Sequence, residues 1–303
     1  MLSRYIHQNV TWIDLESPTQ EEIRTLMDEF GIDTLIADEL LFPSTKPRVE
    51  LTERFMYLVL HFPAVRHTHK MREQEIDIIL GKNFIITTRY EMIDPLHKFS
   101  KVFEVNSLLD KSNLGEHAGF VLYYMLKRLY RSVDHELDSV RQSLSSIEEH
   151  IFSGDEVAMV SAISESARAL LNIRQTIEPH REVLREFETA AAHLFGPAYA
   201  PFARSASDEY YRVHNHVMRL TESVHELRET NNSLLSTKQN ETMRVLTIMA
   251  LFTFPLSLIA TTFAIDAPST PFIRDVNGFW IIVGLMIAVG LSMFAYFRYQ
   301  KWL

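Results

Sequence analysis

A stripe of seven residues in the last quarter of the chain carries side chains suited to chemistry on an ion. Its members are Asn240, Met243, Leu246, Ala250, Phe254, Ser257 and Thr261. They recur at steps of three and four, so on a helix they share one face. The polar members offer amide and hydroxyl oxygens to a hydrated ion, and the apolar members can close a water-filled path by dewetting. The alternative is a stripe that packs helix on helix with no water between.

Two long uncharged segments near the end of the chain must position this stripe. Residues 245–265 and 276–297 contain no Asp, Glu, Lys or Arg. At 1.5 Å per residue, each can cross roughly 30 Å of hydrocarbon. We therefore predict a membrane region over 241–303, with transmembrane helices at about 245–265 and 277–297.

The charges that flank these segments predict their orientation. Lys238 and Arg244 precede the first segment, and Arg298 and Lys301 follow the second. The positive-inside rule then places both termini in the cytoplasm and the short loop 266–276 outside. A multi-pass protein of the cell (inner or plasma) membrane is expected, with the lipid bilayer as a partner.

Composition excludes several classes of protein. The chain has 303 residues, 30 of them basic and 39 acidic, with no Cys and a net charge of −9. The acidic balance argues against nucleic-acid binding, which depends on Lys and Arg at phosphates. The lack of Cys excludes a disulfide scaffold, a zinc ribbon and a cysteine nucleophile. No phosphate loop, nucleophile elbow or HExxH motif is present, so we expect neither an enzyme nor a cofactor.

The first part of the chain, residues 1–112, has an α/β pattern. Short β-rich runs occur at 11–15, 54–62, 75–80 and 83–88. Ser17-Pro-Thr-Gln-Glu-Glu is typical of a helix start, and Gly31 of its C-terminal cap. We predict one mixed sheet with helices in this cytoplasmic domain.

Long helices should fill the second part, residues 113–240, and continue into the membrane. Helical patterns cover 117–151 and 156–194, joined by a tight reversal, and a third runs from about 207 to 265. Only Pro255 interrupts this third pattern, which as one helix would be about 90 Å long. A helix of that length needs lateral support, most simply from copies of itself, so the sequence predicts a homo-oligomer.

Several motifs, in order along the chain, resemble the CorA family of divalent-cation channels and transporters. They include Trp12-Ile-Asp-Leu, Lys46-Pro-Arg-Val-Glu, Glu178-Pro-His-Arg-Glu, Asn240-Glu-Thr-Met-Arg-Val-Leu and Phe254-Pro-Leu. The resemblance covers essentially the whole length. It implies an α+β membrane protein shaped as a funnel: a cytoplasmic α/β sheet domain, a long-helix stalk and two C-terminal transmembrane helices. It also implies a homopentamer that moves Mg²⁺, with Co²⁺ or Ni²⁺ as surrogates, along an axis lined by the seven-residue stripe.

The chain departs from the family at the outer mouth. Ala264, Ile265 and Asp266 stand where the family has Gly-Met-Asn. A ring of Asp266 carboxylates would concentrate cations more strongly than Asn does; alternatively, Asp266 is solvated or paired with Arg274. The departure leaves two other functions open. One is a Zn²⁺ transporter on the same scaffold, with Asp266 as a proton-sensitive group, and the other is a non-conducting membrane sensor or scaffold.

The resemblance also implies regulation by cytoplasmic Mg²⁺ held between subunits. One set of ligands maps onto Asp38 and Glu39. On the stalk, the alignment places Arg212 where the family has its acid, and a Glu39–Arg212 salt bridge between subunits would make the metal unnecessary and weaken the Mg²⁺ feedback. If the gap in the alignment lies elsewhere, Asp208 or Glu209 supplies the stalk ligand. Finally, Arg298 and Lys301 correspond to the family's basic collar.

Overall fold

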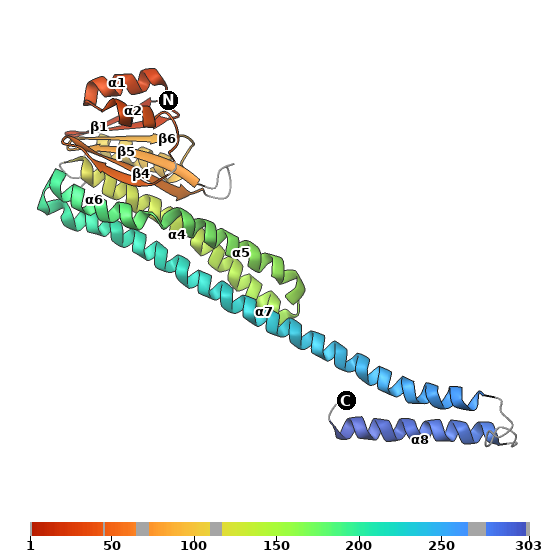
Figure 1. The fold of residues 1–303 in the computed structure, drawn as a ribbon. Helices are drawn as coiled ribbons and strands as arrows, with labels where there is room; N and C mark the ends of the chain where they lie inside the picture. Colours follow the sequence, from red (N-terminus) through yellow and green to blue (C-terminus); the bar gives the residue numbers. More distant parts are fainter. Residues whose placement is uncertain (1, 45, 65–72, 110–116, 266–276, 301–303) are drawn as a thin grey trace. The chain divides into compact units, whose positions relative to one another are not determined.

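The computed structural model describes the chain except for residues 1, 45, 65–72, 110–116, 266–276 and 301–303. Its contacts divide it into two units, residues 1–228 and 229–303 (Figure 1). The domain boundaries predicted from the sequence, after residues 112 and 240, divide the chain by composition rather than by contacts, and they stay predictions.

The first unit is built on a six-stranded mixed sheet. Its strands are β1 (Leu2–His7), β2 (Val10–Glu16), β3 (Arg48–Leu51), β4 (Phe55–Pro63), β5 (Glu73–Gly81) and β6 (Phe84–Arg89). The strand order is β1-β2-β6-β5-β4-β3. Only β2 and β6 pair in parallel. Strands β4 and β5 are buried on both faces, and β4 is accordingly an almost continuous apolar run rather than an alternation.

Two short helices, α1 (Gln20–Phe30) and α2 (Thr34–Glu39), cover one face of the sheet. Thr19 and Glu22 form a capping box at the start of α1, and Gly31 ends it with φ = 66°. Apolar side chains of the two helices join those of the strands in one core cluster that contains Ile23, Ile36, Leu40, Tyr57, Val59 and Ile79. This cluster fixes α2 on the sheet.

Longer helices cover the other face: α3 (Asp94–Leu109), α4 (Ala118–Ser153), α5 (Glu156–Ile177) and α6 (His180–Phe195). Trp12 on β2 packs on Phe99 and Phe103 of α3, with ring centroids 5.4 Å apart in both pairs. Phe62 on β4 packs on Tyr130 of α4 at 5.4 Å. The sheet therefore lies between two layers of helices.

The helical patterns predicted from the sequence hold with one correction. The span 117–151 corresponds to α4, and Gly154 (φ = 106°) makes the reversal after it. The span 156–194 is not one helix, because it breaks between α5 and α6 at Glu178-Pro179. Pro179 has no N–H and its ring clashes with the preceding turn, so a continuous helix is disfavoured there.

The third helix, α7 (Ala200–Phe263), is unbroken for 64 residues although it contains Pro255. Before it stands one 3₁₀ turn, Pro197–Tyr199. In the second unit the last part of α7 is followed by α8 (Gly278–Tyr299). Both helices are long and apolar enough to cross a membrane, and of the 18-residue window that carries this property, 0% is buried in the first helix and 6% in the second.

Candidate functional site

The seven-residue stripe lies on the uncovered side of α7. All seven side chains are exposed in the single chain. The exposed fraction is 57% for Met243, 54% for Leu246 and 72% for Phe254. Apolar side chains this exposed in a membrane region need other copies, lipid or a dewetted path around them.

The opposite side of α7 packs against α8. Its half-buried residues follow the same spacing of three and four: Ile248, Phe252, Pro255, Leu256, Ile259 and Phe263. Phe252 contacts Phe297 of α8 with ring centroids 5.4 Å apart. The α8 helix therefore covers the face that does not carry the stripe, and α7 has one face for its own hairpin and one left free.

The hydroxyl group of Thr261 on the stripe is arranged as a hydrogen-bond acceptor. Thr261 donates its hydroxyl hydrogen to the carbonyl oxygen of Ser257 at 2.8 Å, one turn earlier. Its hydrogen is thus used within the helix, and its oxygen lone pairs are left to accept. The water shell of a cation presents hydrogens outward, so acceptors of this kind suit a hydrated ion.

The predicted outer mouth is described only in part. After α7 ends, Ala264 donates to Ala260 at 3.1 Å and Ile265 to Thr262 at 3.4 Å, which tightens the last turn. Asp266 and Arg274 lie outside the described residues. Of the basic collar, Arg298 is exposed in the last turn of α8, and Lys301 lies outside the described residues.

The four predicted regulatory carboxylates do not meet in one chain. Asp38 and Glu39 are exposed at the end of α2, and Glu39 forms an ion pair with Arg48. On α7, Asp208 is exposed, whereas Glu209 is buried. In the described part of the chain, no three His, Cys, Asp or Glu side chains are grouped to hold a metal. A shared site would therefore need two copies.

The hypothesised salt bridge between Glu39 and Arg212 would also join two copies. In the single chain, the Arg212 guanidinium pairs with Glu209, which also lies 3.9 Å from the ammonium of Lys127. Glu39 and Arg212 each have a different partner in their own chain, so an intersubunit bridge would have to replace both.

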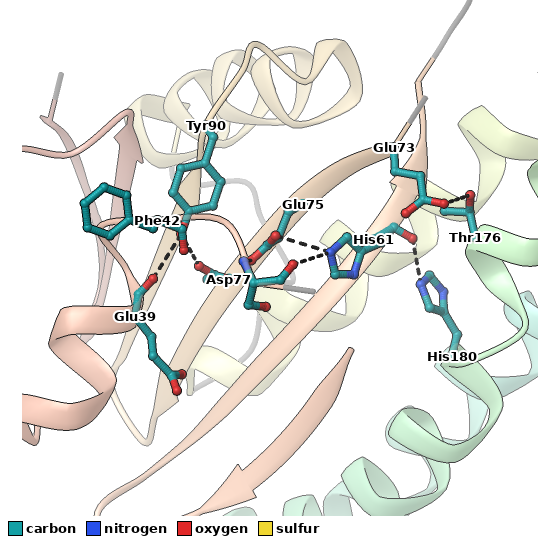
Figure 2. A network of polar contacts seen from close by, with 10 residues as sticks. Glu39, Phe42, His61, Glu73, Glu75, Asp77, Tyr90, Thr176 and His180 are labelled. Atoms are coloured by element: carbon teal, nitrogen blue, oxygen red, sulfur yellow. Dashed lines mark hydrogen bonds and ion pairs between the residues drawn. The ribbon is translucent and has the colours of Figure 1, made fainter. Parts of the chain in front are cut away.

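A buried polar network on the sheet was not predicted from the sequence (Figure 2). In the β4–β5 register, His61 stands opposite Glu75 and Val59 opposite Asp77, so the three polar side chains share one face. Glu75 accepts from the backbone N–H of Ser44 at 2.8 Å, and the Nε2 of His61 lies 3.2 Å from it. The only available indication was the pair of acids in the apolar run Glu75-Ile-Asp77-Ile-Ile-Leu.

The two acids of the network, Glu75 and Asp77, differ in their charge. Burial raises the pKa of Asp77 well above its usual range, and the charge of Glu75 beside it raises it further. Burial would also raise the pKa of Glu75, but hydrogen bonds from His61 and Ser44 prevail and lower it. Burial works against the charge on His61 too, yet the bond to Glu75 raises the pKa of that ring. Asp77 is thus the neutral acid, and Glu75 the carboxylate.

A second branch connects the sheet with the helical layer. His180 on α6 donates from Nε2 to the carbonyl oxygen of His61 at 2.8 Å, and its Nδ1 lies 2.8 Å from the hydroxyl of Tyr130. Because Nε2 must be the donor, Nδ1 accepts from Tyr130 when the ring is neutral. Burial lowers the pKa of His180 to about 3. The neutral His180 ring therefore links the sheet to the helical layer through hydrogen bonds.

Comparison with known proteins places this architecture in a family. The model of the family described as CorA-like Mg²⁺ transporter protein matches residues 7–299. The cobalt/magnesium transport protein CorA of Thermotoga maritima is 25% identical over 295 residues, which cover 97% of this chain and 83% of the relative.

Solved structures show the same fold. The CorA magnesium transporter from Methanocaldococcus jannaschii matches with a TM-score of 0.84 and 19% identity, covering 97% of this chain and 92% of the other. The cytoplasmic domain of ZntB from Vibrio parahaemolyticus matches with a TM-score of 0.62 and 14% identity, covering 78% and 91%. With almost its whole length matched, this chain belongs to the CorA-like Mg²⁺ transporter family, whose members are ion transporters and not enzymes.

Proposed function

We propose that copies of this chain assemble, as a pentamer, into a membrane channel for divalent cations, with Mg²⁺ as the main ion and Co²⁺ or Ni²⁺ as surrogates. The observation that carries the proposal is the free face of α7. Its seven residues are uncovered, while α8 occupies the opposite face. Arranged around an axis, the free faces would line a path with Asn240 at one end and Thr261 near the other.

The side chains of this path suit a small cation that keeps its water. Mg²⁺ dehydrates reluctantly, so rings of amide and hydroxyl oxygens serve it better than a tight charged cage. Met243, Leu246 and Phe254 would form apolar rings that stop flow when they dewet. The membrane potential would drive entry with about 2.3 kcal/mol per charge per 100 mV.

The proposed topology follows the charges at the helix ends. Both termini lie in the cytoplasm of a cell bounded by this membrane, because basic residues flank the inner ends of the two spans. Regulation by cytoplasmic Mg²⁺ is part of the proposal, with Asp38 and Glu39 of one copy facing Asp208 or Glu209 of the next.

Asp266 supports a second candidate function. A carboxylate in place of the signature Asn would hold a cation more tightly and would also take up protons. That combination favours a Zn²⁺ transporter coupled to a proton gradient. Flux of Zn²⁺ alone, enhanced by a pH gradient and lost in Asp266→Asn, would replace the Mg²⁺ proposal.

Two neighbouring threonines provide a matched test in liposomes. Thr261 and Thr262 each donate to a backbone carbonyl one turn earlier, at 2.8 and 2.7 Å, but only Thr261 belongs to the stripe. We expect Thr261→Val to reduce Mg²⁺ or Co²⁺ flux severalfold and Thr262→Val to leave it near the wild-type rate. Equal effects of the two variants would contradict the pore-face assignment, and a silent wild type with an intact oligomer would favour the non-conducting scaffold.

A further inference from the structure

The hydroxyl of Tyr90 faces more acceptors than it has hydrogens. It lies 2.8 Å from Oδ2 of Asp77, 3.1 Å from the carbonyl oxygen of Phe42 and 3.3 Å from that of Glu39. A phenol has one hydrogen to donate, and backbone carbonyls can only accept. Figure 2 shows Tyr90 between Asp77 on β5 and the residues that end α2. The three acceptors therefore compete for one proton.

The protonation state of Asp77 decides this competition. An ionised carboxylate is the strongest of the three acceptors, since charge-assisted hydrogen bonds are about twice as strong as neutral ones. A neutral Asp77 is a weaker acceptor, and its own hydrogen is shared with the ionised Glu75. The Tyr90 hydrogen is then available to the carbonyl groups of Glu39 and Phe42.

Asp77 sits where a neutral carboxylic acid is favoured. Its side chain is only 1% exposed, and the neighbouring Glu75 forms a side-chain hydrogen bond with it. Two carboxyl groups can share a hydrogen bond only when one of them carries a proton, and burial disfavours a second charge beside the first.

The surroundings of Asp77 supply charges from every packed element. Glu75 is its neighbour on β5, and Tyr57 and His61 come from β4. Arg48 of β3 contributes the nearby positive charge and lies over the Tyr57 ring at 5.5 Å, while the Glu39 carboxylate of α2 is engaged by Arg48. The ionised Glu75 outweighs Arg48, because it is buried whereas Arg48 is partly exposed, and it favours the neutral form of Asp77.

We propose that Asp77 and Tyr90 form a proton-operated latch on the C-terminal end of α2. Neutral Asp77 leaves the Tyr90 hydroxyl to the carbonyl groups of Glu39 and Phe42, and ionised Asp77 withdraws it. Only the proton on Asp77 moves between protein and water. The latch goes beyond transport: it makes the attachment of α2, the helix that carries Asp38 and Glu39, depend on cytoplasmic pH.

The sign of the effect follows from the site. The folded chain favours protonated Asp77, whose pKa is raised, so the latch is closed at low pH and opens as pH rises through that pKa. Hydrogen exchange of the amides of Leu40, Leu41 and Phe42 reports it. These amides donate to Ile36, Asp38 and Glu39 at 3.2 to 3.3 Å, and they exchange when the end of α2 opens.

The experiment measures this exchange in the full-length protein in micelles between about pH 6 and about pH 9. Protection is taken relative to the intrinsic exchange rate at each pH, and Asp28→Asn, an exposed acid on α1, serves as the matched control that should follow the wild type. We expect wild-type protection to fall about fivefold across the range, as for the loss of one hydrogen bond. Asp77→Asn should remain protected at every pH, because its amide is never ionised and can donate to Tyr90.

A second variant keeps the test decisive if Asp77→Asn does not fold. Tyr90→Phe removes only the hydroxyl, and it should show the low protection of the open latch throughout the range. A flat wild-type profile overturns the proposal. So does an Asp77→Asn profile, or a Tyr90→Phe profile, that follows the wild-type dependence on pH.

Discussion

The polar side chains compared between the two units of this chain lie in opposite environments, buried on the sheet and exposed on α7. On the sheet, Asp14 and Arg89 are each about 6% exposed and are bonded to one another within the chain. On α7, Asn240, Ser257 and Thr261 are exposed and face away from α8. A sheet covered by two helical layers can enclose charges, whereas a hairpin of two helices has no interior. The first unit therefore pairs these charges within one chain, and the second leaves its polar side chains to other copies, lipid or water.

The largest effect should come from breaking a buried ion pair on the sheet. The Nη2 of Arg89 lies 3.1 Å from Oδ2 of Asp14, whose other oxygen accepts from Thr87 at 2.7 Å. Arg89→Met leaves a buried carboxylate without its cation, and we expect a loss of about 3–5 kcal/mol of stability. Thermal unfolding of the full chain in detergent measures it.

The control for this variant is an ion pair at the surface. Arg4 and Glu29 are 2.5 Å apart, with 39% and 38% of their side chains exposed. Arg4→Met should cost only about 0–1 kcal/mol. If both variants cost the same, burial does not distinguish the two pairs and the contrast between buried and exposed charges fails.

The hydrogen bonds of His180 between the sheet and the helices should give a pH effect of intermediate size on the stability of the fold. Its folded pKa of about 3 lies below its ordinary value of 6.5, so the unfolded chain binds the proton first. Stability is then complete above about pH 6.5 and falls by about 1.4 kcal/mol per unit as pH decreases towards 3. Melting temperatures from pH 7 to pH 5 should show this fall in wild type and in His225→Asn, an exposed histidine. His180→Asn should lack it; the same slope in that variant would refute the assignment.

The smallest effect on stability, and the sharpest on function, concerns two phenylalanines of α7. Phe252 packs on Phe297, so Phe252→Ala should lower the stability of the hairpin by about 1 kcal/mol. Phe254 is 72% exposed, so Phe254→Ala should leave the hairpin's stability unchanged but alter ion flux severalfold. Because the chain has no native Cys, labelling of Phe254→Cys and Phe252→Cys with a hydrophilic thiol reagent checks the faces directly. Faster labelling at position 252 than at position 254 would show that the two faces of α7 are assigned the wrong way round.

The sequence analysis missed the two edge strands of the sheet and the helix break at a proline. The pattern located β2, β4, β5 and β6, which have strongly apolar runs, but not β1 or β3 at the two edges of the sheet. These edge strands are half exposed and β3 has only four residues, so their apolar pattern is weak. The break at Pro179 was visible in the sequence, but the strong helical pattern on both sides concealed it.

The buried polar network was not predicted from the sequence, for a different reason. Glu75 and Asp77 alternate with Ile76 and Ile78, but the strand is buried on both faces, so the alternation does not show that the acids turn towards α2. Their partners Ser44, His61 and Tyr90 come from three other segments. Nothing local in the sequence connects these positions, and only the β4–β5 register and the packing of α2 bring them together.

The sequence by itself determined the properties that depend on neighbours along the chain. These are the two membrane spans, the unbroken α7, the stripe at helical spacing and the ordered motifs of the family. Only the tertiary structure decided which face of α7 is covered by α8 and which acid shares the hydroxyl of Tyr90. The physical reason is that periodicity is set by local backbone geometry, whereas burial and proton sharing depend on groups that meet only when distant segments pack.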